Sequence, residues 1–149
     1  MQVVVELVAA RVIGDELRFT IQTAACPRTG DPDATARAEL ATLFPDFWLR
    51  RAIVHSTSWR YEDERIVLTY LGYSDEFDVA PLPLTIPLAR ASDIRRGPAA
   101  VAAHAIRHLA FLVREARDGY GQLLRPDTHA ALIAVAPDVS GRHDLKGAA

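Results

Sequence analysis

A pair of histidines four residues apart is the most direct candidate for a functional site in this chain. His104 and His108 belong to the sequence His-Ala-Ile-Arg-His, and on a helix this spacing presents both imidazoles to one metal ion. The internal Glu of the zinc-hydrolase motif is absent, and Arg107 beside the pair disfavours a cation. We therefore expect a solvated polar face that also carries Phe111, and we keep a partner interface and a metal site as alternatives.

A second group of candidate residues precedes this helix. Ile53, His55, Thr57 and Trp59 alternate along a predicted strand and should share one face. A histidine on such a face is typical of a hydrogen-bonded core or pocket wall, aromatic rings can stack on a planar ligand, and paired arginines can hold a phosphate or carboxylate. The predicted ligand-binding residues are His55, Trp59, Tyr70, Arg50 and Arg51.

Several other chemistries find no support in the residues. The single cysteine, Cys26, excludes an intrachain disulfide and a multi-cysteine zinc site. Neither the glycine-rich phosphate loop nor the Gly-x-Ser-x-Gly elbow occurs. His55 and Ser56 are adjacent on a strand, so they point to opposite faces and cannot form a nucleophile–base pair with each other.

The composition describes an ordinary globular domain. The chain has 149 residues, 50% of them hydrophobic and 24% charged, which fits one domain with its own core. A net charge of −2 gives no support for nucleic-acid binding, and no apolar run approaches the roughly 20 residues of a membrane span. The N-terminus lacks signal-peptide features, so we expect a cytoplasmic protein with one domain at 1–137 and a flexible tail at 138–149.

The elements that must position these side chains can be read from turns and periodicity. Gly14-Asp15 is a favourable turn between two strands, and Asp31-Pro32 is a favourable helix start. Both faces of the second hairpin's return strand are apolar, so it should be covered on both sides. We predict an α/β fold with a mixed or antiparallel sheet of two hairpins and helices on both faces, in the order strands 2–13 and 16–23, helix from 31, strands 51–60 and 64–73, an extended edge segment 77–88, helix 98–117, and a short helix after Pro126.

The stretch from Gly30 to Leu40, Gly-Asp-Pro-Asp-Ala-Thr-Ala-Arg-Ala-Glu-Leu, resembles the start of the central helix of Nudix hydrolases. Its place between two hairpins is similar to that family, as are the strands at 54–59 and 66–71. The long helix that follows a proline-containing segment also fits. The resemblance covers about residues 2–117 and implies a Nudix-like sandwich.

The family's signature, Gly-x5-Glu-x7-Arg-Glu-hydrophobic-x-Glu-Glu-x-Gly-hydrophobic, implies an Mg²⁺ or Mn²⁺ site built from glutamates. If Glu39 and Leu40 match its Glu-hydrophobic pair, Thr42 and Leu43 stand where the two metal-binding glutamates belong. Glu39 is the only Glu between positions 17 and 61. One carboxylate cannot build that site, so the catalytic residues stay unknown and the weak candidates are Glu39, His104 and His108.

Three functional hypotheses follow. The leading one is a catalytically degenerate Nudix-like module that needs no metal or other cofactor and binds a nucleotide-like small molecule or a protein partner. The second is an active hydrolase of a nucleoside-diphosphate-linked substrate that uses Mg²⁺ or Mn²⁺ at a non-standard site. The third is a homodimer whose interface is either the His104/Phe111 helix face or an edge strand.

Overall fold

Five strands form one mixed sheet in the computed structural model, which describes residues 1–135. The strand order is β3-β4-β1-β2-β5, with β1 parallel to β4 and the other neighbours antiparallel. The short β5, within the proline-rich segment, is an edge strand as predicted. The α/β class and the two hairpins are therefore confirmed, with bounds β1 Gln2–Ile13, β2 Glu16–Cys26, β3 Ile53–Glu62, β4 Arg65–Tyr73 and β5 Leu84–Pro87.

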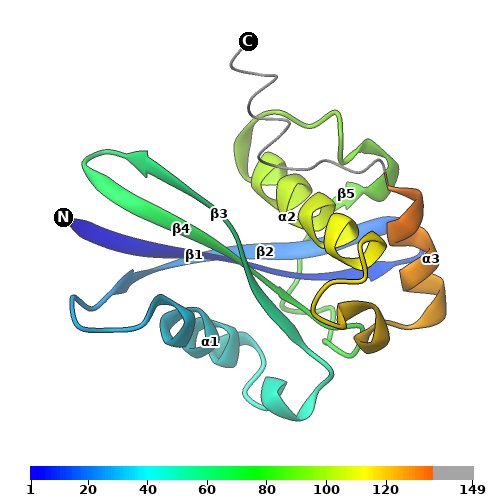
Figure 1. The fold of residues 1–149 in the computed structure, drawn as a ribbon, viewed down its shortest axis with the longest axis horizontal. Helices are drawn as coiled ribbons and strands as arrows, with labels where there is room; N and C mark the ends of the chain where they lie inside the picture. The colour runs from blue at the N-terminus through cyan, green and yellow to red at the C-terminus, as the bar shows by residue number, and fades with distance from the viewer. Residues whose placement is uncertain (136–149) are drawn as a thin grey trace.

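Helices cover both faces of this sheet (Figure 1). Helix α1 (Pro32–Leu43) lies on one face, and α2 (Gly97–Arg114) with α3 (Pro126–Ala134) lies on the other. Successive side chains of a strand point to opposite faces, so Val5 and Leu7 of β1 join the core under α1, while Val8 and Ala10 join the core under α2. The central strand is consequently buried on both sides, and so is most of β4.

The start of α1 follows the predicted signals. The Asp31 side chain accepts a hydrogen bond from the Asp33 N–H, at 3.0 Å, and Pro32 is the first helical residue. Gly72 of β4 lies under this helix, where an added Cβ would come within 2.9 Å of a Leu40 methyl. The glycine therefore lets α1 approach the sheet closely.

A β-bulge in β3 changes which side chains share a face. Ser56 lies opposite Tyr70 and Ser58 lies opposite Thr69, so Thr57 is an extra residue in the strand. Beyond it Trp59 lies opposite Leu68, on the α1 face, whereas His55 lies opposite Leu71, on the α2 face. The prediction that Ile53, His55, Thr57 and Trp59 share one face is wrong, because the bulge shifts the alternation by one residue.

The long helix is also covered more fully than expected. Its predicted apolar stripe packs on the sheet, but Arg107 on the opposite face is buried, and His104, His108 and Phe111 are half-buried. The expectation of a solvated face is wrong, because β3 and the segment after the helix lie against it. No helix within residues 1–135 is long and apolar enough to cross a membrane; the predicted tail at 138–149 lies outside the described residues.

Candidate functional site

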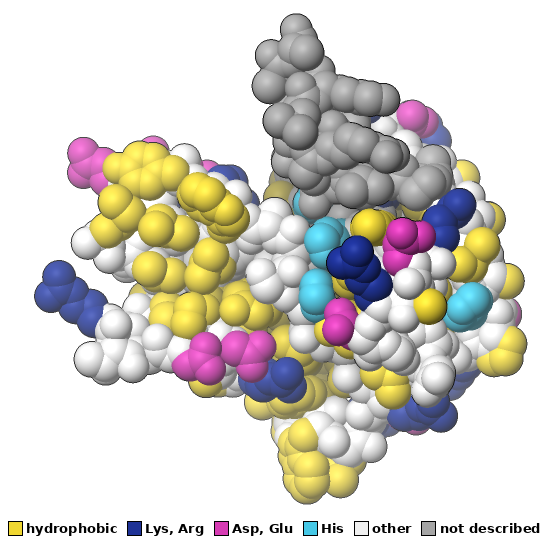
Figure 2. Space-filling model, viewed as in Figure 1, with side chains coloured by type: hydrophobic (Ala, Val, Ile, Leu, Met, Phe, Trp, Pro, Cys, Tyr) yellow, Lys and Arg dark blue, Asp and Glu magenta, His cyan; other side chains and the backbone are white. Residues whose placement is uncertain are grey.

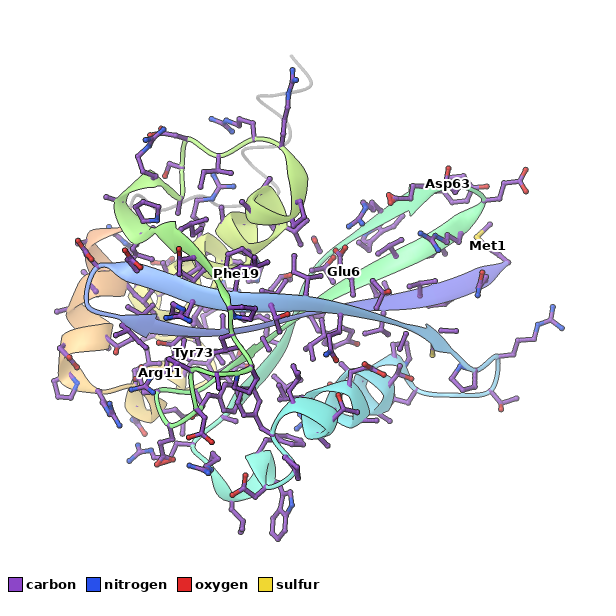
Figure 3. All side chains as sticks on the ribbon, turned by 180° about the vertical axis from the view of Figure 1, so that it is seen from behind. Met1, Glu6, Arg11, Phe19, Asp63 and Tyr73 are labelled. Atoms are coloured by element: carbon purple, nitrogen blue, oxygen red, sulfur yellow. The ribbon has the colours of Figure 1, made fainter. Side chains whose placement is uncertain are left out.

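Glu6 interrupts the apolar run of the central strand β1 and is only 7% exposed. Its Oε1 accepts hydrogen bonds from Arg60 Nη1 at 2.9 Å and Thr69 Oγ1 at 2.8 Å, and its Oε2 accepts one from Arg60 Nη2 at 3.1 Å. Burial raises the pKa of this carboxyl, but the hydrogen bonds and charge of Arg60, with Thr69, outweigh burial and bring the pKa below its usual value. The carboxylate is therefore ionised at neutral pH in the middle of the sheet (Figure 3).

Arg60 lies on β3 beyond the bulge and holds two carboxylates at once. Besides Glu6, it binds Glu62 through Nε at 3.0 Å and Nη2 at 3.3 Å. The hydrogen bonds that Arg60 donates to Glu6 and Glu62 raise the pKa of the guanidinium. With one cation between two anions, this group keeps an excess of negative charge, which suits a ligand that presents hydrogen-bond donors.

Two cavities adjoin this group where α2 crosses the sheet, and we call them together the α2 cleft. One has a volume of about 450 Å³ and the other about 210 Å³, and they share Arg60 and Val101 as lining residues. Sites for small molecules typically have volumes of roughly 300–1,000 Å³, with apolar walls and a few polar groups. The lining comprises Glu6, Thr20, Ile21, Ser58, Arg60, Thr69, Leu84, Gly97, Pro98, Ala100, Val101 and His104.

The N-terminus of α2 lies at the larger cavity. Gly97, the first helical residue, has a left-handed φ of 73°, and the Arg96 side chain does not cap the helix. The first N–H groups of a helix have no partner within the helix and carry the positive end of its dipole. Arg95 and Arg96, both exposed, immediately precede this end, so this part of the α2 cleft is electropositive.

A chain of aromatic rings leads from the α2 cleft toward the segment after α2. The His104 and His108 rings are 6.4 Å apart between centroids, and His108 and His55 are 5.4 Å apart. His55 Nδ1 then lies 2.9 Å from the hydroxyl of Tyr120, in the 3₁₀ turn η3 (Tyr120–Leu123). The histidines thus join β3, α2 and η3, and Figure 2 shows two of them side by side at the surface.

The imidazoles of His55 and His108 are neutral at pH 7. Burial, followed by the proximity of His55 and His104, lowers the pKa of His108 to about 4. Burial also lowers the pKa of His55, against the opposing charge of Asp118. Neutral imidazoles can both donate and accept hydrogen bonds. His104, the next ring in this chain, lines the smaller cavity.

This cluster should make the protein less stable in mild acid. Because the His108 pKa is lower in the folded protein than the unfolded value of 6.5, the unfolded chain binds more protons between about pH 6.5 and 4, and stability falls through that window. For this half-buried ring we expect a loss of about 1–3 kcal/mol. Urea unfolding at pH 7 and pH 4.5 measures it. His108→Gln should reduce this loss, whereas His129→Gln on α3 should leave it unchanged; an equal loss in all three proteins would contradict the prediction.

The structure does not bring the predicted catalytic candidates together. Glu39 lies on α1, on the opposite side of the sheet from His104 and His108 on α2 (Figure 1). Across residues 1–135, no group of three or more His, Cys, Asp and Glu side chains is placed to hold a metal ion. The two-histidine spacing is present on the helix, but the third ring beside it is His55, whose Nδ1 already contacts Tyr120.

The predicted ligand-binding residues also separate. Trp59 and Tyr70 lie on the α1 face, the first exposed and the second buried, while His55 lies on the α2 face. Arg50 and Arg51 hold the segment after β4: Arg50 Nη1 donates to the Glu76 carbonyl at 3.1 Å, and the Arg51 N–H donates to Glu76 Oε1 at 2.9 Å. A third cavity, of about 260 Å³, lies beside Arg51, Asp75, Glu76, Leu123, Leu124, Arg125 and Pro126.

Sequence reasoning missed Glu6, Ser58, Arg60 and Thr69, which line the α2 cleft. One signal for them was visible, because Glu6 is the only charged residue between Gln2 and Ala10 in a strand otherwise rich in valine. A charge in a buried strand needs a partner. Compared with known proteins, the chain matches no protein-family model and no curated protein.

Proposed function

We propose that this chain is a Nudix-like binding module that holds a nucleotide-like small molecule in the α2 cleft. One observation carries the proposal: a buried, ionised Glu6, fixed by Arg60 and Thr69, lines a cavity of about 450 Å³. Within residues 1–135, Glu6 Oε2 accepts a hydrogen bond only from Arg60, and a carboxylate oxygen has room for a second donor. Ring and exocyclic N–H groups of a nucleobase supply such donors.

The other end of the α2 cleft suits a phosphate. Helix N-termini bind phosphate through their free N–H groups and dipole, and Gly97 and Pro98 of α2 line the larger cavity. Glu6 would repel a phosphate, whereas the helix end with Arg95 and Arg96 attracts one. These opposite preferences give the ligand a direction, with its base toward Glu6 and its phosphate toward α2.

The residues of α1 support a function in ligand binding without metal-dependent hydrolysis. A Nudix-like enzyme needs clustered glutamates on its central helix, and this chain has Thr42 and Leu43 at the positions that the resemblance assigns to them. Glu39 alone supplies too few oxygen ligands for Mg²⁺. The proposal therefore gives the protein a ligand but no cofactor.

Calorimetric titration in EDTA tests the proposal with a panel of nucleobases, nucleosides and nucleoside mono- and diphosphates. We expect one or more members to bind, and Glu6→Gln to weaken every binding ligand by about 10-fold or more. Arg96→Ala should weaken only the phosphorylated ligands. Glu16→Gln, on the exposed end of β2, is the matched control and should change nothing.

Two results would overturn this proposal. One is that no member of the panel binds the wild-type protein at millimolar concentration. The other is release of phosphate or a nucleoside monophosphate when the diphosphates are incubated with Mg²⁺ or Mn²⁺, especially if Glu39→Gln abolishes the release. That second result would favour the hydrolase instead.

A further inference from the structure

An apolar row crosses four strands on the α1 face of the sheet, beyond the end of α1. Tyr61 of β3 lies opposite Ile66 of β4, Ile66 lies beside Val3 of β1, and Val3 lies opposite Cys26 of β2. We call these four residues the apolar row. Tyr61 is 56% exposed, and Trp59 beside it on β3 is 69% exposed. Figure 2 shows hydrophobic side chains gathered over this wing of the sheet.

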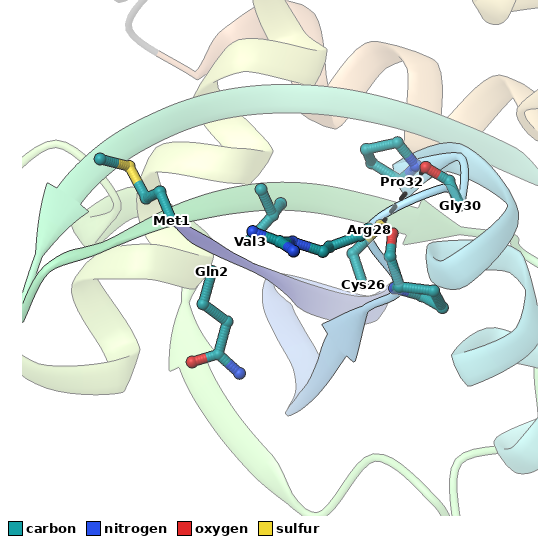
Figure 4. Close-up of a pocket in the computed structure, with 8 residues that line it drawn as sticks. Met1, Gln2, Val3, Cys26, Arg28, Gly30 and Pro32 are labelled. Carbon is teal, nitrogen blue, oxygen red and sulfur yellow. Dashed lines mark hydrogen bonds between the residues drawn. The ribbon is translucent and has the colours of Figure 1, made fainter.

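The two ends of the apolar row have complementary shapes. At the β3 end, Tyr61 and Trp59 project from the surface. At the β2 end, a cavity of about 580 Å³ lies beside Val3 and Cys26 (Figure 4). The loop that leads into α1 forms one wall of this cavity, which is open to solvent. Its lining residues are Met1, Gln2, Val3, Cys26, Pro27, Arg28, Gly30 and Pro32.

The charges at the two ends are complementary as well. Beyond Tyr61, the turn between β3 and β4 carries the exposed acids Asp63 and Glu64. Beyond Cys26, the loop between β2 and α1 carries the exposed Arg28 at its tip, while its one acid, Asp31, is engaged as the cap of α1. Figure 1 shows that this turn and this loop form two separate corners at one end of the sheet, with the N-terminus between them.

We propose that a second copy of this chain docks on the apolar row and forms a two-fold symmetric homodimer. A two-fold axis parallel to the strands, running between β4 and β1, brings the β3 end of each copy against the β2 end of the other. Tyr61 of each copy then enters the cavity beside Cys26 of the other, and Arg28 of each faces Asp63 and Glu64 of the other. Self-complementarity of this kind is what an isologous interface requires.

The shape and the charge of this surface both fit a second copy of the chain. A partner of another sequence would need to supply both a cavity and an aromatic knob at matching positions, whereas a second copy supplies both automatically. Aromatic side chains seated in a partner's pocket contribute much of the binding energy of protein interfaces. This interface uses neither the His104/Phe111 helix face nor backbone pairing of an edge strand, and it leaves the α2 cleft open.

Disulfide trapping tests this arrangement, because Cys26 is the only cysteine. In Tyr61→Cys, the new thiol is three strand spacings from Cys26 of the same chain, roughly 14 Å. A disulfide requires Cα atoms within about 7 Å, so oxidation can join these two positions only between copies. We expect at least half of Tyr61→Cys to run as a covalent dimer on a non-reducing gel. Tyr61→Cys combined with Cys26→Ser should not cross-link at this pair, and Thr85→Cys on the far edge strand β5 should cross-link at least 10-fold less.

Light scattering of the wild-type protein provides the second measurement. We expect a dimer at tens of micromolar, and at least a 30-fold weaker dimer in Trp59→Ser/Tyr61→Ser with an unchanged circular dichroism spectrum. A wild-type monomer across this range overturns the proposal. So does equal cross-linking of Tyr61→Cys and Thr85→Cys. Neither readout depends on the ligand of the α2 cleft, so this proposal and the proposed function can fail separately.

Discussion

Replacing Arg60 with alanine should lower the free energy of unfolding by about 3 kcal/mol at pH 7. The substitution removes the hydrogen bonds at 2.9 and 3.1 Å and the counter-charge of Glu6, while the carboxylate stays buried beside Thr69. Breaking a buried ion pair by removing one partner costs about 3–5 kcal/mol. The Arg60 side chain is 40% exposed, so water can replace part of the lost interaction and the lower end of that range applies.

The loss should shrink as the pH falls. In the wild-type protein the pKa of Glu6 lies below its usual value of 4.5, so its contribution is present above that pH and is lost as the pH falls through the lowered pKa. Without Arg60, burial dominates and raises the pKa of Glu6 above 4.5. The folded variant then takes up a proton more readily than its unfolded form, which stabilises it in acid relative to the wild type.

Urea unfolding of both proteins at pH 7 and pH 5 measures this, and the histidine contribution cancels in the difference between them. The matched control is Arg90→Ala, which removes an exposed ion pair with Asp93 and should cost less than about 0.5 kcal/mol. Glu6→Leu/Arg60→Met removes both charges and should unfold within about 1 kcal/mol of the wild type, yet bind no ligand in the α2 cleft. A loss below about 1 kcal/mol in Arg60→Ala, or one that grows in acid, would contradict the account of Glu6.

Most of the elements could be predicted because their signals are local. The turn at Gly14 and Asp15 and the start of α1 at Asp31 and Pro32 each depend on a few adjacent residues. The apolar character of both faces of β4 predicted its burial for the same reason. Predicting these features does not require knowing which residues lie opposite them in the folded protein.

The bulge at Thr57 could not be predicted in this way. The sequence of β3 continues to alternate across it, and only the pairing with β4 shows that one residue has no partner. That single residue moves Trp59 and Tyr61 to the α1 face and Arg60 to the face that carries Glu6. Both candidate surfaces, the α2 cleft and the apolar row, therefore depend on a non-local register.

The candidate site was hidden for a related reason. Glu6 and Arg60 are separated by 54 positions and meet only through the order β3-β4-β1. His104 and His108 were recognised as a pair, but their neighbour His55 is on β3, and the cover over that helix face comes from elements distant in sequence. The residue types predicted which chemical groups are available, but the register of the sheet determines which of these groups lie close together.

Replacing Asp75 with alanine should lower the free energy of unfolding by about 3–5 kcal/mol. Asp75 follows β4 and is 4% exposed. Its Oδ1 accepts from the Tyr73 hydroxyl at 2.8 Å and from Thr128 Oγ1 at 2.9 Å, and its Oδ2 accepts from the Arg125 N–H at 2.8 Å. Alanine would leave these donors without an acceptor at the start of α3, where the Arg125 side chain provides no cap.

The size of the effect follows from how far the carboxylate reaches. Tyr73 itself accepts a hydrogen bond from the Val12 N–H at 2.9 Å, so Asp75 connects β1 and β4 to the first turn of α3. A carboxylate at a helix N-terminus is also favoured by the helix dipole. Asp75 thus stabilises the start of α3 as Asp31 stabilises the start of α1, although Asp75 lies about 50 residues earlier in the chain than the helix it contacts.

Asp75→Asn separates hydrogen bonding from packing. Its amide oxygen can still accept from Tyr73 and Thr128, but its NH₂ group meets the Arg125 N–H, donor against donor, so we expect a loss of about 1–2 kcal/mol. Asp78→Ala, at an exposed position a few residues further along, is the control and should cost less than about 0.5 kcal/mol. Urea unfolding followed by circular dichroism measures all three. If asparagine were as damaging as alanine, the negative charge at the start of α3, rather than the number of hydrogen bonds, would be what fixes this helix to the sheet.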